Sequence, residues 1–192
     1  LDPDLFIDRS LRGKVEGKVV LITGGSSGIG KAAAIKIAEA GAKVVIAARG
    51  ADELEATRKE IVDAGFLCYA YKTDLADLDS CDSLIEHVNK DFGAVDILIN
   101  NAGRSIRRSI ELSFDRFHDF ERTMQLNYFG SLRLIMQALP KMIEHRRGHI
   151  INISSIGVLA SSPRFSAYVA SKAALDAFSS CAQGELSGKG IS

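Results

Sequence analysis

The sequence predicts an α/β domain with a doubly wound parallel sheet, and two observations carry this prediction. Short, mostly apolar runs recur along the chain, as expected for parallel strands that are buried on both faces. Longer segments with a helical recurrence of apolar residues alternate strictly with these runs, which is typical of a sheet covered by helices on both faces. In such a sheet, ligands bind at the carboxyl ends of the strands.

The predicted elements alternate from the first strand to the last helix. We expect strands at Val19–Ile22, Val44–Ala47, Leu67–Tyr71, Ile97–Ile99 and Ile150–Ile153. We expect helices at Ile29–Ala40, Ala51–Ala64, Asp77–Asp91, Phe114–His145 and Phe165–Leu186. Glycines that favour helix termination stand between a helix and the next strand, at Gly41, Gly65, Gly93 and Gly148.

Length and composition limit the classes of protein that fit. With 192 residues and 46% hydrophobic content, the chain can bury one sizeable core but is too short for two ordinary α/β domains. Lys plus Arg and Asp plus Glu both number 24, so no net field attracts nucleic acid or an anionic membrane. No apolar run reaches the roughly 20 residues of a membrane-spanning helix.

The cysteines and histidines predict no metal site. Cys68, Cys81 and Cys181 are odd in number and lack CxxC spacing, which disfavours a disulfide framework and a zinc site. We expect them to be small core residues, in a protein of the reducing cytoplasm. The histidines lack metal-ligand spacing, and we assign no chemical role to His87, His118, His145 and His149.

A tyrosine and a lysine form a candidate proton-transfer pair. Tyr168 and Lys172 stand four residues apart in a predicted helix and therefore share one face. A nearby ammonium lowers the pKa of a phenol from its usual value of about 10, which makes the phenol a usable proton donor and acceptor. Many helices carry such a pair on a solvated surface, so the pair alone is weak evidence.

The loop Thr23–Gly30, with the sequence TGGSSGIG, joins a predicted buried strand to a helix. Gly24, Gly28 and Gly30 allow a sharp turn and a close approach of the backbone to a pyrophosphate. The pyrophosphate would lie against the amide groups and the positive dipole end of the following helix. Because the loop has this strand-to-helix context, it predicts a dinucleotide site rather than a plain glycine-rich turn.

The choice of cofactor follows from the end of the second strand. A carboxylate there would accept hydrogen bonds from the ribose of NAD, but the chain has Arg49 and no acid. A guanidinium suits the 2′-phosphate of NADP, with Ser26 or Ser27 as supporting donors. The alternative, a solvated loop cation, does not explain the missing acid. The sequence favours NADP(H).

These motifs, in this order with Asn100–Gly103, Asn127 and Ser155, resemble the classical short-chain dehydrogenase/reductase family. The resemblance runs from about Lys18 to Ser192 and implies a Rossmann-like fold. It makes residues 18–192 an NADP-binding reductase domain and residues 1–17 a lead-in from an upstream domain. It also implies that further strands and a substrate-covering segment follow Ser192.

The resemblance assigns roles to individual residues. Asn127 holds a water that connects Lys172 to solvent, Ser155 donates a hydrogen bond to the substrate oxygen, Tyr168 transfers the proton, and Lys172 binds the nicotinamide ribose. Ser154 is a rival to Ser155, whose spacing to Tyr168 matches the family. The implied cofactor contacts are Thr23, Gly24, Ser26, Ser27, Gly28, Ile29, Gly30, Arg49, Asp74, Leu75, Asn101, Ala102, Gly103, Tyr168 and Lys172.

A narrower resemblance involves Leu1–Phe6, Gly103–Ser109, Ser113–Gly130 and Ile153–Leu159. These stretches are similar to the C-terminal reductase domain of bacterial fatty acyl-CoA reductases. That similarity implies NADPH-dependent reduction of a long-chain acyl-CoA to a fatty aldehyde, with expulsion of the thiol. The alternatives are a carbonyl reductase or alcohol dehydrogenase that acts on a ketone or 3-oxoacyl substrate, and a non-catalytic cofactor-binding scaffold.

Two further expectations concern partners. Arg104, Arg107 and Arg108 follow the fourth strand at its ligand-binding end and could meet coenzyme A phosphates. The alternative, which we favour, is that they pair with Asp115, Asp119 or Glu121 or lie at a subunit contact. The family resemblance also implies a homo-oligomer, a dimer or tetramer assembled through the helices Phe114–His145 and Phe165–Leu186.

Overall fold

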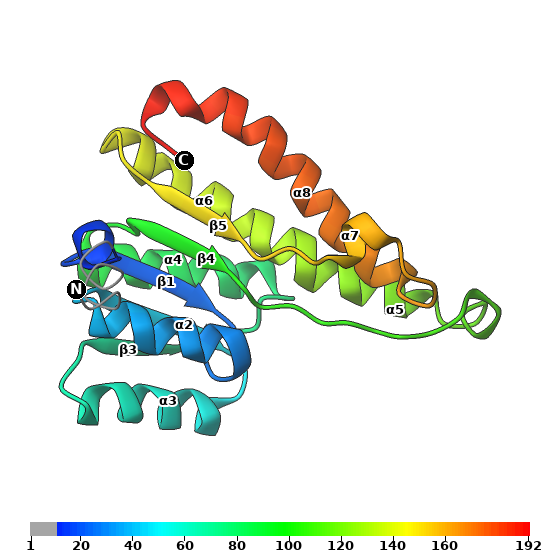
Figure 1. Ribbon diagram of the computed structural model, residues 1–192, viewed down its shortest axis with the longest axis horizontal. Helices are drawn as coiled ribbons and strands as arrows, with labels where there is room; N and C mark the ends of the chain where they lie inside the picture. The colour runs from blue at the N-terminus through cyan, green and yellow to red at the C-terminus, as the bar shows by residue number, and fades with distance from the viewer. Residues whose placement is uncertain (1–10) are drawn as a thin grey trace, which may run out of the picture.

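A five-stranded parallel sheet forms the centre of the computed structural model, which describes residues 11–192. Its strands are β1 (Val19–Thr23), β2 (Lys43–Ala48), β3 (Cys68–Lys72), β4 (Ile97–Asn100) and β5 (His149–Asn152). They lie in the order β3-β2-β1-β4-β5, and every neighbouring pair is parallel (Figure 1). The predicted doubly wound α/β sheet is confirmed, and each strand lies within about one residue of its expected place.

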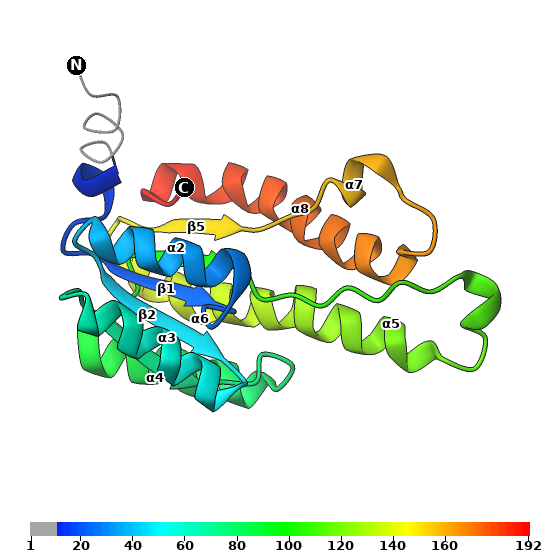
Figure 2. The ribbon, with the colours of Figure 1, turned by 60° about the horizontal axis from the view of Figure 1, so that its bottom comes forward.

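Alternate residues of the central strands supply two separate cores. Leu21, Val45 and Leu98 face one core, which the helices α4 (Leu78–Phe92) and α6 (Ser131–Glu144) complete. Val20, Ile22 and Ile46 face the other core, which α2 (Gly28–Glu39) and α3 (Ala51–Asp63) complete. Because side chains alternate across a strand and both faces are covered, the strands are almost uniformly apolar. Figure 2 shows the helices on both sides of the sheet.

The order of the strands determines where ligands bind. The chain runs outward from β1 through β2 to β3, and then returns to place β4 on the other side of β1. Between β1 and β4 the direction of winding reverses, and in open α/β sheets ligands bind at this reversal, outside the carboxyl ends of the strands. The loops after β1 and β4 therefore meet at the candidate site.

The single helix expected at Phe114–His145 differs in the structure. It begins three residues later as α5 (Phe117–Met124), continues as a π-helical segment η2 (Gln125–Gly130), and ends as α6. Gly130 allows the helix to pass close to the neighbouring chain, because a Cβ there would lie 2.2 Å from the carbonyl oxygen of Leu75. π segments inside helices often occur at functional sites, and this one contains Asn127.

Three short elements were not expected. The 3-10 turns η1 (Ile110–Leu112) and η3 (Ser187–Lys189) and the short helix α7 (Gly157–Ala160) lie in connections. The last long helix, α8 (Ser166–Leu186), agrees with the prediction within one residue. No helix within residues 11–192 has the length and apolarity that a membrane crossing requires.

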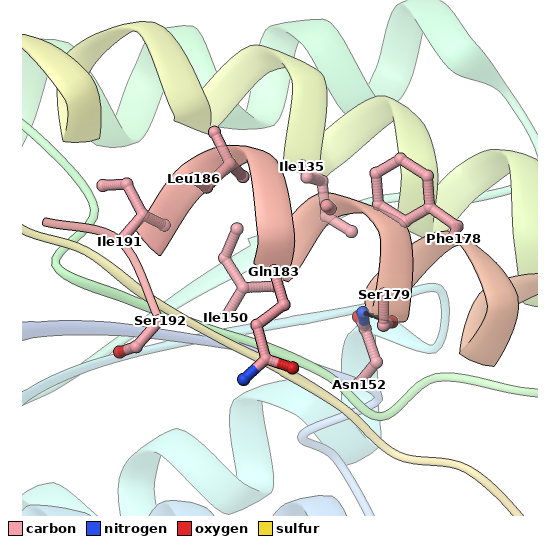
Figure 3. A pocket seen from close by; sticks show the side chains of 10 residues that line it. Ile135, Ile150, Asn152, Phe178, Ser179, Gln183, Leu186, Ile191 and Ser192 are labelled. Atoms are coloured by element: carbon pink, nitrogen blue, oxygen red, sulfur yellow. Dashed lines mark hydrogen bonds between the residues drawn. The ribbon is translucent and has the colours of Figure 1, made fainter. Parts of the chain in front are cut away.

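A mostly apolar cavity of about 250 Å³ lies where α8 crosses the outer edge of β5 (Figure 3). Next to it, Ile191 forms an isolated parallel β-bridge with Gly148, and the Ile150 amide donates to the carbonyl oxygen of Ser192 at 2.8 Å. The outer edge of β5 is therefore paired over its first residues. The cavity is lined by Ile135, Ile150, Asn152, Phe178, Ser179, Ala182, Gln183, Leu186, Ile191 and Ser192.

The first ten residues of the predicted lead-in lie outside the described part of the chain. Residues 11–15 are helical, and Val15 is buried in the core beneath α2 and α3. The end of the lead-in therefore packs against the domain, while the predicted boundary at residue 17 stays a prediction.

Candidate functional site

The loop between β1 and α2 has a backbone that strongly favours glycine. Gly24 and Gly28 have φ angles of 66° and 53°, in the left-handed region that side chains disfavour. A Cβ on Gly30 would lie 2.2 Å from the carbonyl oxygen of Gly24, so helix and loop touch directly. This close turn at a helix N-terminus fits a pyrophosphate, which needs exposed amides and no side chains in the way.

Thr23 and Asn101 join this loop to the end of β4. The Thr23 hydroxyl accepts hydrogen bonds from the amides of Asn101 and Ala102, both at 3.0 Å. The Asn101 carboxamide donates to the carbonyl oxygens of Thr23 and Gly24, at 3.0 and 3.3 Å. These bonds span 77 residues or more of sequence, and they hold the two loops at the winding reversal in one arrangement.

An open groove of about 450 Å³ runs along these loops. It brings together the predicted Ser26, Ser27 and Arg49 with Leu75 and Gly103. Asp74 is not among the lining residues, and its carboxylate accepts a hydrogen bond from the amide of Ala76 at 3.0 Å. The groove is lined by Gly24, Ser26, Ser27, Ala48, Arg49, Gly50, Glu53, Thr73, Leu75, Ala102, Gly103 and Leu126.

Glu53 is a groove residue that sequence reasoning missed. It lies in the first turn of α3, and its carboxylate covers Gly50, since a Cβ on Gly50 would lie 2.4 Å from Glu53 Oε2. The end of β2 has no acid, as predicted, but α3, the helix that follows it, places the acid Glu53 in the same groove as Arg49. The available signal was the position, because acids in a first helical turn stay near its N-terminus, stabilised by the helix dipole.

Lys172 connects the groove to α8. Its side chain is buried, and its ammonium donates to the carbonyl oxygen of Ile153 at 2.7 Å. A Cβ on Gly103 would lie 3.5 Å from both Lys172 Nζ and Asn127 Oδ1, so both groups lie close to Gly103, which lines the groove. Burial lowers the pKa of Lys172 below its usual value, while the charge of Asp176 acts in the opposite direction. Tyr168 lies one turn earlier on the same helix and is half-buried.

Asn127 is fully buried and makes three hydrogen bonds with protein groups. Its Nδ2 donates to the carbonyl oxygen of Arg104 and to Ser171 Oγ, both at 2.9 Å, and its Oδ1 accepts the amide of Arg104 at 2.8 Å. Ser171, which the sequence did not single out, in turn donates to the carbonyl oxygen of Tyr168 at 2.7 Å. Asn127 thus joins the chain after β4 to the helix turn that carries Tyr168. Its predicted role in holding a water stays a prediction.

The two candidate serines have different environments. The Ser154 hydroxyl donates to Asp176 on α8 at 2.9 Å, which gives it a structural partner. Ser155 Oγ accepts the amide of Gly157 at 3.1 Å, and a Cβ on Gly157 would lie 3.2 Å from both this oxygen and the Val169 side chain. Ser155 and Val169, the residue that follows Tyr168, therefore both lie next to Gly157, and the choice of Ser155 over Ser154 stays a prediction.

The three arginines after β4 do not act as one group. Arg108 pairs with the buried carboxylate of Asp119 at 3.3 Å, as the alternative to a phosphate contact proposed. Arg104 and Arg107 are exposed, and within residues 11–192 neither forms an ion pair. The remaining candidates for an anionic ligand are therefore Arg104 and Arg107.

The residues without an assigned role mostly lie as expected. The four histidines are exposed. Burial raises the pKa of Cys68 to about 11 and that of Cys81 to about 12, which suits buried core thiols. The expectation was wrong for Cys181, which is exposed on α8.

Comparison with known proteins identifies the family. The short chain dehydrogenase family matches residues 18–192, so the chain belongs to this family of nicotinamide-dependent oxidoreductases. It is 55% identical to a fatty acyl-CoA reductase of Acinetobacter baylyi, over 94% of this chain and 61% of that protein. It is 46% identical to a fatty acyl-CoA reductase of Mycobacterium tuberculosis, over 100% of this chain and 66% of that protein.

Solved structures show the same fold. A metagenomic short-chain oxidoreductase in complex with NADP superimposes with a TM-score of 0.88 at 32% identity, over 92% of this chain and 80% of that chain. A xylitol dehydrogenase with bound NAD⁺ superimposes with a TM-score of 0.87 at 28% identity, over 93% and 68%. The present chain spans little more than half the length of the curated relatives first matched, 61% and 54%.

Proposed function

We propose that this chain is the catalytic core of an NADPH-dependent reductase that converts a long-chain acyl-CoA to a fatty aldehyde. The observation that carries the proposal is the 55% identity with a fatty acyl-CoA reductase over 94% of the chain. The site supports the proposal in two ways. It has a groove suited to a dinucleotide, and it has a buried ammonium on α8, that of Lys172, which donates to the carbonyl oxygen of Ile153.

In this proposal the groove holds the cofactor. Amides of the loop before α2 bind the pyrophosphate, and Arg49 with Ser26 and Ser27 binds the 2′-phosphate. When bound, the nicotinamide supplies a hydride. Lys172 is buried beside Gly103 at the inner end of the groove, where its ammonium can hold a ribose hydroxyl. The short turn at Gly24 and Gly30 leaves room for this arrangement.

The protein groups on the substrate side bind the carbonyl oxygen. Ser155 and Tyr168 each donate a hydrogen bond to it, which stabilises the negative charge that develops as the carbon is reduced. Tyr168 then gives its proton to the oxygen and regains one from solvent, with the Lys172 ammonium nearby. With a thioester, the resulting hemithioacetal breaks its C–S bond. The products are an aldehyde and a free thiol, which takes the hydroxyl proton.

A second candidate function is the reduction of a ketone or 3-oxoacyl substrate, or the oxidation of an alcohol. It is supported by the structural likeness to an NAD⁺-bound xylitol dehydrogenase, since the same hydroxyl groups serve either carbonyl. The two functions differ in one product, because only thioester reduction releases a thiol. A non-catalytic cofactor-binding scaffold is the third candidate, and it predicts no turnover at all.

To distinguish the three candidate functions, the protein is assayed with palmitoyl-CoA, a β-keto ester and a simple ketone, each with NADPH or NADH. We expect oxidation of NADPH with palmitoyl-CoA, with one free thiol released for each aldehyde formed. Turnover of the ketone alone would make the protein a carbonyl reductase. Cofactor binding without turnover of any substrate would support the scaffold.

Arg104 and Arg107 extend the test to substrate recognition. If they bind phosphates of coenzyme A, the double change to Ala raises the KM for palmitoyl-CoA and spares the KM for a free aldehyde. The effect weakens with salt, because exposed charges are screened within about 8–10 Å near physiological ionic strength. Lys90→Ala, on the exposed side of α4, is the control. Equal loss on both substrates would contradict this role.

Three proposals concern the whole protein. We propose a homo-oligomer formed through α5, α6 and α8, a longer polypeptide with an upstream domain, and a cytoplasmic location. The exposure of Phe129 and Met136, which are 44% and 48% accessible, supports a subunit contact on the α5–α6 side. Sedimentation at micromolar concentration tests the first proposal, and a monomer would contradict it.

A further inference from the structure

A single buried carboxylate lies among four basic side chains on the substrate side of the molecule. Asp119, in the first turn of α5, is 4% exposed. Its oxygens lie 2.8 Å from Arg122, 3.1 Å from Arg116, 3.3 Å from Arg108 and 3.4 Å from His118. We call these five residues the Asp119 cluster. Three of the partners are its helix neighbours, but Arg108 comes from the connection after β4.

The Asp119 cluster stays charged under ordinary conditions. Hydrogen bonds from Arg122 and Arg116 lower the pKa of Asp119 to about 2. Three guanidinium groups against one carboxylate leave an excess of positive charge, so each arginine depends on Asp119 to offset repulsion from the others. Without the carboxylate, the Arg108 guanidinium loses the one ion-pair partner that it has within residues 11–192 and faces the charges of Arg116 and Arg122.

The consecutive helical segments α5 and η2 hold the chain after β4 at two points, and the Asp119 cluster is one of them. Asn127 binds both backbone groups of Arg104, at 2.8 and 2.9 Å. Asp119 Oδ2 lies 3.3 Å from Arg108 Nε, four residues further on, and the two form an ion pair without a hydrogen bond. The two holding residues are eight positions apart, about 12 Å along a helix. The segment 104–108 is therefore stretched along the helix that carries Asn127.

A backbone hydrogen bond connects Arg108 to the chain that precedes Tyr168. Its amide donates to the carbonyl oxygen of Arg164 at 2.8 Å. Arg164 and Ser161 have φ angles of 73° and 47°, a left-handed conformation that side chains adopt only when their surroundings impose it. The helix α8 begins two residues after Arg164, at Ser166.

The two connected segments also pack closely. Arg108 and Arg164 line the same small cavity of about 10 Å³, together with Asp119, Phe120 and Ala167. Ala167 is buried and directly precedes Tyr168. A shift of Arg108 would therefore be felt at the first turn of α8, where the proposed proton donor stands.

We propose that Asp119 is a positioning residue for the substrate side of the site. It holds segment 104–108, and through the Arg108–Arg164 contact it holds segment 161–167 beside Tyr168 and Ser155. The proposal rests on the function proposed above, because it takes Tyr168 and Ser155 as the groups that bind the carbonyl oxygen. It involves no contact of Asp119 with the substrate or the cofactor.

The first test is Asp119→Asn in the full enzyme, with palmitoyl-CoA or whichever carbonyl compound the enzyme reduces. The expected result is a KM about ten-fold higher, because small displacements of positioning groups are costly, with a smaller fall in kcat. NADPH affinity stays unchanged, since Thr23 and Asn101 hold the groove independently. Asp119→Glu, which keeps the charge, recovers most of the loss.

The control is Asp82→Asn, which breaks a two-pronged ion pair with Arg133 between α4 and α6, away from the substrate side. It should leave KM unaltered. If Asp119→Asn does not fold, Arg108→Met is the second variant, because Arg116 and Arg122 still neutralise Asp119 there. An unchanged KM in the folded variant, or a matching loss of NADPH affinity, would overturn the proposal.

A readout that needs no activity separates this proposal from the proposed function. Hydrogen exchange should accelerate at residues 104–108 and 161–167 in Asp119→Asn and not in Asp82→Asn. Unchanged exchange in these segments would refute the positioning role, whatever the enzyme reduces. Faster exchange together with full activity of Tyr168→Phe would instead leave the Asp119 restraint in place and refute the assigned chemistry.

Discussion

The cofactor side and the substrate side of this domain are held together by different means. On the cofactor side, glycine backbone and hydrogen bonds of Thr23 and Asn101 fix short loops directly at the strand ends. On the substrate side, long connections extend from the sheet (Figure 1). Buried polar side chains hold these connections.

The comparison explains how one fold can serve many substrates. The cofactor loops have little freedom, because a single added methyl group would collide with the backbone. The substrate-side connections depend on charges and carboxamides, which other side chains could replace without altering the sheet. Binding specificity commonly resides in such connections, positioned by a rigid scaffold.

The largest effect is expected from removing the phenol of the substrate side. Tyr168→Phe keeps the ring but removes the proposed proton donor, so kcat should fall by about 10²–10⁴-fold, the range for general acid catalysis. NADPH affinity should stay close to the original value, because the groove is held elsewhere. Steady-state kinetics and a binding titration measure the two quantities. Retention of most activity would show that Tyr168 is not the proton donor.

Gly30→Ala should lower the affinity for NADPH on the cofactor side and leave the arrangement of the substrate side unchanged. The added Cβ would lie 2.2 Å from the Gly24 carbonyl oxygen and 2.5 Å from Asn101 Nδ2. Forcing the loop apart costs roughly 1–3 kcal/mol, so NADPH affinity should fall by up to about a hundred-fold. Gly184→Ala is the control, since a Cβ there meets nothing within 4 Å. Equal NADPH affinities of the two variants would argue against a close loop.

Arg49→Ala removes a proposed side-chain contact with the 2′-phosphate from the cofactor side, where most of the structure is held by backbone groups. One charge-assisted phosphate contact contributes about 1.5–3 kcal/mol, so the preference for NADPH over NADH should fall roughly ten- to a hundred-fold. Affinity for NADH should change little. Fluorescence titration with both cofactors measures the ratio, and equal binding of both by the unmodified protein would refute the assignment to NADP.

Glu53→Gln should have the smallest effect, in the opposite direction. The carboxylate shares the groove with Arg49, so it repels a 2′-phosphate across an exposed, well-screened site. Removing its charge should raise NADPH affinity by roughly two- to five-fold, in the range of exposed charge pairs. High salt should reduce the gain. A fall in NADPH affinity would show that Glu53 binds the ribose or supports the loop instead.

Much of the cofactor side could be predicted because its signals are local. Apolar runs located each strand within about one residue, and the glycine spacing located the loop whose φ angles require it. Arg49, Ser26 and Ser27 were expected to lie near one another, because the parallel strands that precede them end at the same edge of the sheet, and all three line the groove. Glu53 was missed because helical geometry, and not strand position, brings it back to the groove.

The sequence by itself determined the sheet, the winding reversal and the residue types at the candidate site, because periodicity and glycine conformation act over a few residues. Tertiary structure alone decided the π segment at Asn127, the partner of Ser154 and the pairing of Arg108 with Asp119. Asn127 meets Ser171 across 44 positions, and Ser154 meets Asp176 across 22. The physical reason is distance along the chain: such partners meet only after the helices have packed, and several acids near Arg108 would have satisfied its charge equally well.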